Sequence, residues 1–151
     1  MLRIFLDTEF TNLNERHLIS IALVADRQDF YAEVDGFPVD RCSDFVQKTV
    51  LPHLGKAAAA RMKPEVLRPA LQVWLEQIRG DEPEVVVAFD YKGDWKLLVQ
   101  ALGEAPVWLK AQDVRGNTDE TVRKEFFNMT GLPEHHALYD AKALKFAFRQ
   151  P

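Results

Sequence analysis

The stretch IFLDTEF, residues 4–10, joins an apolar run directly to two acids and decides how the rest of the fold is read. The run over residues 2–6 predicts a central strand. Asp7 and Glu9 are then expected just past the end of that strand. Because they are two residues apart, an extended backbone would direct both carboxylates to the same side, and Thr8 and Phe10 to the other.

Two more strands follow in the first quarter of the chain. Residues 17–25, HLISIALVA, predict the second strand, and the alternating stretch 29–34, DFYAEV, predicts the third. The gap at residues 26–28 has the length of a hairpin loop, so these two strands should be antiparallel. The polar loop over residues 11–16 is also short, so the second strand should pair back against the first.

The middle of the chain is predicted to be helical. The periodicity indicates helices over residues 43–54 and 64–78, with Ser43 or Asp44 as the cap of the first. Pro52 should bend or stop that helix early. The stretch between the helices, residues 55–63, is expected to be a mobile or partly helical connection.

The last part of the chain alternates strands with helices. We expect strands over residues 84–88 and 107–111, and helices over residues 94–102, 118–130 and 137–148. EVVVA, residues 84–88, is the continuous apolar run of a strand buried on both faces. The whole predicts a single α/β domain over residues 1–151, in which helices flank a mixed five-stranded sheet of three antiparallel strands followed by parallel ones.

Composition narrows the class of protein. Hydrophobic residues at 47% and charged residues at 28% are ordinary for a soluble globular chain. No apolar run is long enough for a membrane span, and no signal peptide is apparent. The single cysteine, Cys42, allows no internal disulfide, which favours a cytoplasmic location. A net charge of −4 argues against an extensive grip on duplex DNA, which depends on many basic contacts to phosphate.

Two further clusters of polar residues accompany Asp7 and Glu9. Asp94 lies in GDWKLL, a few residues after the EVVVA strand, and His135 and Asp140 lie in EHHALYD before and within a helix. Ligands in such sheets gather beyond the carboxyl ends of the strands. Converging carboxylates repel one another unless cations fill the site, and Mg²⁺ and Mn²⁺ prefer oxygen ligands. The clusters therefore suggest a two-metal site for phosphoryl transfer.

These motifs, in this order, resemble those of the DEDDh 3'-5' exonucleases of the RNase H-like fold. The resemblance is greatest to small bacterial 3'-5' exoribonucleases of the oligoribonuclease and RNase T type, and it covers residues 4–148. It implies two Mg²⁺ or Mn²⁺ ions that cleave single-stranded RNA or short oligonucleotides from the 3' end and release nucleoside 5'-monophosphates. By the same resemblance, the metal ligands are Asp7, Glu9, Asp94 and Asp140, and the general base is His135.

The second motif departs from the family pattern at two positions. Asp90 stands where the family usually has asparagine, and Gly93 stands where it has an apolar residue. Asp90 is therefore a rival ligand, although Asp94 fits the family's register and is followed by two leucines at helical spacing. His136 is the alternative to His135, since its spacing from Asp140 in the sequence is the spacing that a tyrosine has in a sister group of exonucleases.

Other residues and functions stay open from the sequence alone. Candidate substrate-binding residues are Thr8, Phe10, Asp90 and His136, and Phe10 could turn into the cleft and stack on a base. Taken singly, each acid also suits a turn or a helix cap. The alternative functions are a 3'-5' DNA exonuclease and a nucleotide- or RNA-binding module with little turnover. A homodimer would enlarge the substrate surface.

Overall fold

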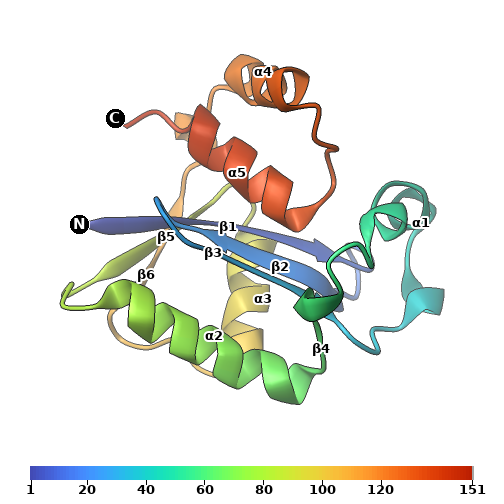
Figure 1. Ribbon diagram of the computed structural model, residues 1–151, viewed down its shortest axis with the longest axis horizontal. Helices are drawn as coiled ribbons and strands as arrows, with labels where there is room; N and C mark the ends of the chain where they lie inside the picture. The colour runs from blue at the N-terminus through green and yellow to red at the C-terminus, as the bar shows by residue number, and fades with distance from the viewer. Residues whose placement is uncertain (151) are drawn as a thin grey trace.

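A six-stranded sheet runs through the centre of the computed structural model, which describes residues 1–150 (Figure 1). The spatial order of the strands is β4-β3-β2-β1-β5-β6. Their bounds are β1 Leu2–Phe10, β2 Leu18–Val24, β3 Asp29–Val34, β4 Arg61–Met62, β5 Val85–Phe89 and β6 Leu109–Asp113. The first three strands are antiparallel neighbours, and β5 and β6 continue the sheet parallel to β1. The predicted α/β fold with a mixed sheet is confirmed.

The predicted count of five strands is wrong, because β4 adds a sixth. β4 has only two residues, Arg61 and Met62, and pairs in parallel with the end of β3. It lies in the stretch 55–63, together with the 3₁₀ turn η3 Ala58–Ala60. Two residues carry no periodicity, so this strand depends on the free edge of β3 and has no local signal.

β1 is also longer than predicted, and this changes the place of the two acids. Asp7 and Glu9 lie within the strand, where they pair with Ala22 and Ser20 of β2. On its other side, β1 pairs with β5 only as far as Phe5. Because β2 alone supports the last residues of β1, Asp7 and Glu9 stand beside the open end of β5.

Helices cover both faces of the sheet. Their bounds are α1 Asp44–Thr49, α2 Pro64–Arg79, α3 Lys92–Leu102, α4 Glu120–Thr130 and α5 Ala137–Ala147. In Figure 1, α5 and α4 lie above the sheet and α2 and α3 below it. Alternation along β1 serves both layers, since Ile4 and Leu6 belong to the core with α2 and α3, whereas Phe5 packs near Leu144 of α5.

The helix bounds differ from the predicted ones mainly at their ends. The predicted helix 43–54 is divided into α1 and the 3₁₀ turn η2 Leu51–His53, with Pro52 inside the turn, where it cannot continue the helical hydrogen bonds. α4 begins after Asp119, whose carboxylate accepts a hydrogen bond from the Val122 amide and caps the helix. The last strand lies two residues later than predicted, at β6.

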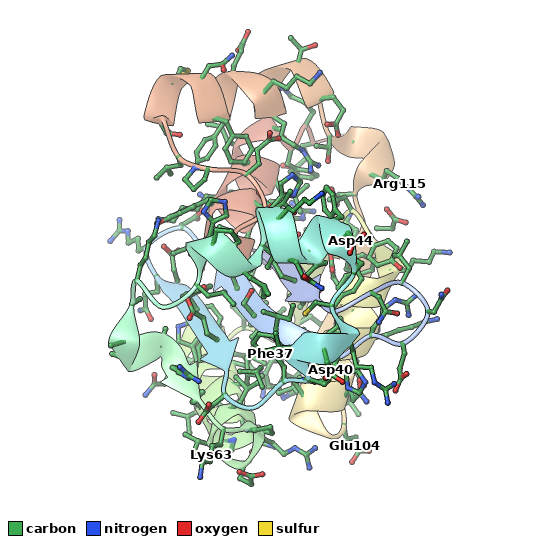
Figure 2. All side chains as sticks on the ribbon, turned by 90° about the vertical axis from the view of Figure 1, so that its right-hand side faces the viewer. Phe37, Asp40, Asp44, Lys63, Glu104 and Arg115 are labelled. Carbon is green, nitrogen blue, oxygen red and sulfur yellow. The ribbon has the colours of Figure 1, made fainter. Side chains whose placement is uncertain are left out.

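The carboxyl ends of β1, β3, β5 and β6 lie at one edge of the sheet. Figure 2 looks toward this edge, with α1 and its first residue Asp44 facing the viewer. Within residues 1–150, no helix combines the length and apolar character that crossing a membrane requires.

Candidate metal centre

Four of the predicted ligands come together where β1 passes the end of β5. β1 carries Asp7 and Glu9, the first turn of α3 carries Asp94, and the first turn of α5 carries Asp140. Two groups of three acids each place one carboxylate oxygen per residue within 4.8 Å of the others: Asp7 with Asp90 and Asp94, and Asp7 with Glu9 and Asp140. Asp7 belongs to both groups, so it could contribute a ligand oxygen to a metal ion held by either group.

Thr8 holds one of these acids in place. Its hydroxyl donates a 2.6 Å hydrogen bond to Oδ1 of Asp94, and both residues are buried. Thr8 and Asp7 point to opposite faces of the sheet, so Thr8 meets α3 while Asp7 faces α5. Thr8 is a predicted substrate-binding residue, and in the structure its hydroxyl binds the Asp94 carboxylate.

Burial and mutual repulsion raise the pKa values of these carboxyl groups above their ordinary values. Burial, followed by the charges of Asp94 and Asp140, raises the pKa of Asp7 well above its usual value. Burial also raises the pKa of Glu9 to about 9, that of Asp94 to about 8 and that of Asp140 to about 6. Each of these values refers to the protein without cations.

The donor set fits a hard divalent cation. Oδ2 of Asp7 is buried and has no hydrogen-bond partner, so this carboxylate keeps an acceptor that no donor among residues 1–150 satisfies. A cation supplies what this oxygen lacks and removes the repulsion between the acids. All the oxygens are carboxylate oxygens, which suit Mg²⁺ or Mn²⁺. The cluster can therefore hold a metal ion.

Asp90 belongs to one group of acids but is bound to an arginine. Its Oδ2 accepts a 2.7 Å hydrogen bond from Arg123 of α4, and the two side chains are 25% and 21% exposed. The charge of Asp90 is thus largely matched within the protein. Arg123 is not recognisable from the sequence, because a residue in the middle of a polar helix gives no local sign of a partner 33 residues away.

The two neighbouring histidines have different surroundings. His135 has a φ of 64°, the only positive φ of a non-glycine residue in the described part of the chain. Its amide donates a 3.2 Å hydrogen bond to Oδ1 of Asp140, and its ring lies edge-on to Phe45. Backbone strain of this kind gathers at functional sites. His135 is therefore tied to the acid cluster through Asp140.

The ring of His136 is part of the helix start and the protein interior. Its Nδ1 accepts a 3.2 Å hydrogen bond from the Leu138 amide, which caps α5. The ring stacks on both Tyr31 and Tyr139, and burial lowers its pKa. This arrangement leaves the ring engaged on its faces and at one nitrogen.

Phe10 lies next to the acids but on an irregular stretch of β1. The pairing with β2 shifts register between Glu9 and Phe10. The Phe10 ring stacks on Tyr91, with ring centroids 5.8 Å apart, and the guanidinium of Arg16 lies 5.6 Å from the Tyr91 centroid. Neither Tyr91 nor Arg16 was predicted as a site residue from the sequence. The only signal for them is that an aromatic residue and a cation stand close in sequence to the acids.

Comparison with known proteins adds no family assignment. Neither a scan against protein-family models nor a search of curated proteins gives a match to this chain.

The raised pKa values predict how stability depends on pH without metal. Groups whose pKa is higher in the folded state bind more protons when folded, so their stabilisation is lost as the pH rises. In EDTA, the melting temperature should fall as the pH rises from about 6 to about 9, through the pKa values of Asp140, Asp94 and Glu9. Mg²⁺ or Mn²⁺ should restore it at high pH, because binding to the folded state alone stabilises that state.

Calorimetry with and without EDTA tests this, using Asp94→Asn and, as a matched control, the exposed Asp81→Asn. Asp94→Asn should raise the melting temperature in EDTA at pH 8 and reduce the gain from metal, whereas Asp81→Asn should change neither. A melting temperature that rises with pH in EDTA would contradict the assignment.

The Asp90–Arg123 pair predicts a compensating double substitution. Arg123→Met leaves the Asp90 charge unpaired beside Asp7 and Asp94, and should lower the free energy of unfolding by about 1–3 kcal/mol. Adding Asp90→Asn should recover most of the loss, because the unpaired charge is removed. Urea denaturation in EDTA measures both, with the exposed Lys124→Met on the same helix as control. If the changes that the two substitutions cause in the free energy of unfolding simply add, the two residues are not coupled.

Proposed function

We propose that this protein is a Mg²⁺- or Mn²⁺-dependent 3'-5' exonuclease of the DEDDh type, with an RNase H-like fold, that acts on single-stranded RNA or short oligonucleotides. The observation that supports the proposal most is that two clusters of three acids each have Asp7 in common. A shared carboxylate suits two cations close together, and such a pair is a common device for in-line displacement at phosphorus.

Each residue has a definite part in this proposal. Asp7, Glu9 and Asp140 would hold one ion, and Asp7 with Asp94 the other. Cations bound there would supply charge stabilisation at the phosphoryl group and would lower the pKa of a water. Thr8 orients Asp94 through its hydrogen bond. His135, positioned by its amide bond to Asp140, takes the proton from the attacking water as general base.

The fold supports the proposal through the placement of the motifs. Three antiparallel strands precede two strands parallel to β1, and the acids lie at the carboxyl end of β1 beside the end of β5. Ligand sites of open α/β sheets lie at that edge. The first turns of α3 and α5 approach the same point from opposite faces of the sheet.

We propose RNA rather than DNA as the substrate because of the resemblance of the motifs alone. The net charge of −4 favours short or single-stranded ends over long duplex substrates. A binding module with little turnover needs no base beside the acids, so the strained His135 favours an enzyme. The nucleoside 5'-monophosphate product, the homodimer and the cytoplasmic location belong to the same proposal.

Cleavage of labelled oligonucleotides tests the proposed activity. Single-stranded RNA and DNA of equal sequence, labelled at the 5' end, are incubated with the protein in Mg²⁺, in Mn²⁺ and in EDTA. We expect a ladder that shortens from the 3' end with metal and vanishes in EDTA and in Asp7→Ala, while the exposed Asp81→Asn cleaves like the wild type. If neither oligonucleotide is cleaved with either metal, the protein is not a nuclease, and the binding module remains.

The two histidines should differ sharply in their effect on rate. A general base contributes about 10²–10⁴-fold, so His135→Ala should lower kcat by that factor. His136→Asn keeps a capping side chain at the start of α5 and should leave kcat near the wild-type value. Single-turnover cleavage measures both variants, and circular dichroism checks their folding. The opposite order of effects would assign the base to His136.

A further inference from the structure

The Tyr91 ring lies against two side chains from other segments, the ring of Phe10 and the guanidinium of Arg16. Phe10 ends β1, Tyr91 precedes α3, and Arg16 belongs to the loop before β2. The two aromatic rings are nearly parallel, at 19°, and their centroids lie 5.8 Å apart, so the rings are offset and do not cover each other. All three side chains are half-buried, which leaves part of this surface open to solvent.

Gly93 is what allows the Tyr91 ring to lie there. A Cβ added at Gly93 would come within 2.8 Å of Cζ of Tyr91, closer than real Cβ contacts. Any larger residue at position 93 would thus displace the ring. Gly93 is also the position where the exonucleases that the motifs resemble usually have an apolar residue. Here the Tyr91 ring occupies the space that such a side chain would need.

Arg16 offers a positive charge that no carboxylate neutralises. Among residues 1–150 it forms no ion pair, and its Nε is buried without a hydrogen-bond partner. By contrast, the nearby Arg41 binds Glu15 at 2.7 Å. In a chain of net charge −4, an unpaired arginine beside the Tyr91 ring suits an anion that carries planar groups.

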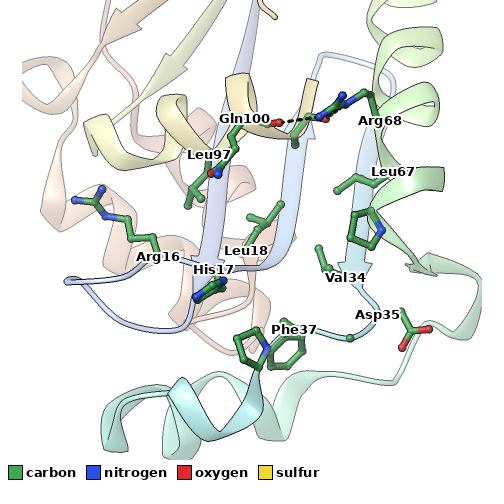
Figure 3. A pocket seen from close by; sticks show the side chains of 14 residues that line it. Arg16, His17, Leu18, Val34, Asp35, Phe37, Leu67, Arg68, Leu97 and Gln100 are labelled. Atoms are coloured by element: carbon green, nitrogen blue, oxygen red, sulfur yellow. Dashed lines mark hydrogen bonds between the residues drawn. The ribbon is translucent and has the colours of Figure 1, made fainter. Parts of the chain in front are cut away.

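Arg16 links this group of side chains to the pocket in Figure 3. In sequence, Phe10 follows Glu9 and Tyr91 follows Asp90, so the group adjoins the acids along the chain. At the other end, Arg16 lines a pocket of about 300 Å³ between α2, α3 and the segment after β3. Its walls include Phe37, Leu67 and Leu97, with His17 and Gln100 as polar neighbours. Asp35 and Arg68 also line it, so the pocket offers charged and polar groups beside its apolar walls, which suits a planar base with polar edges.

We propose that Phe10, Tyr91 and Arg16 form a track that binds single-stranded nucleic acid, with a base on the aromatic surface, a phosphate on Arg16 and a further base in the pocket. The inference rests on the proposed function for the direction of the strand, but its test does not depend on cleavage. Stacking on aromatic rings tolerates any base, so the track accepts RNA and DNA sequences alike.

Fluorescence anisotropy with labelled eight-nucleotide oligouridine and oligothymidine measures binding, with Ca²⁺ in place of Mg²⁺. Loss of one stacking contact weakens binding by about 5-fold to 100-fold, which we expect for Tyr91→Leu, whereas Tyr91→Phe keeps the ring and should bind like the wild type. Gly93→Ala should weaken binding by displacing the ring. Arg16→Met should weaken it and reduce the slope of log affinity against log salt by about 1. The exposed Arg27→Met is the control.

Weaker binding of either oligonucleotide by Tyr91→Leu and Arg16→Met, with circular dichroism unchanged, supports the track. Wild-type affinity in both variants would overturn it, even if the protein cleaves RNA. Conversely, a protein that binds through these residues but never cleaves would keep the track and lose the proposed activity.

Discussion

The carboxylate of Asp7 is buried among other acids, and one of its oxygens has no hydrogen-bond partner. Burying it there requires β1 to extend beyond β5, and β1 does so because β2 continues to pair with it. The acids of α3 and α5 approach this point in the first turn of each helix, where the helix dipole favours negative charge. The repulsion around Asp7 is therefore eased by the helices, and cations can remove the remainder.

Two successive residues of β1 link this point to both layers of the fold. Alternation turns Asp7 toward α5 and Thr8 toward α3, where Thr8 binds Asp94. Asp140 meets Asp7 and Glu9 from the other face. A change in the register of β1 by one residue would exchange these faces and separate all the acids at once. The geometry of the site thus depends on the same pairing that holds the centre of the sheet.

The parts of the fold that were predictable are those with a local pattern. The apolar run before Asp7, the EVVVA strand and the periodic helices each carry their own signal, and the spacing of Asp7 and Glu9 already placed both carboxylates on one side. The length of β1, the short strand β4 and the partner of Asp90 were not predictable, because each is decided by a segment distant in sequence. Tyr91 was missed for a different reason: its ring occupies the space left by the missing side chain of Gly93, and no hydrophobic pattern marks that space in the sequence.

The two departures in the second motif are each compensated by another residue. Asp90 adds an acid where the exonucleases that the motifs resemble usually have a neutral asparagine, and Arg123 supplies the opposite charge. Within residues 1–150, the other four acids, Asp7, Glu9, Asp94 and Asp140, have no cationic side chain as a partner, so they are the carboxylates that a bound metal ion would neutralise. Gly93 gives up an apolar side chain, and the Tyr91 ring occupies the space. Because each loss has a matching gain nearby, the departures preserve the charge and the shape of the site, and they bring Arg123 and Tyr91 to its border.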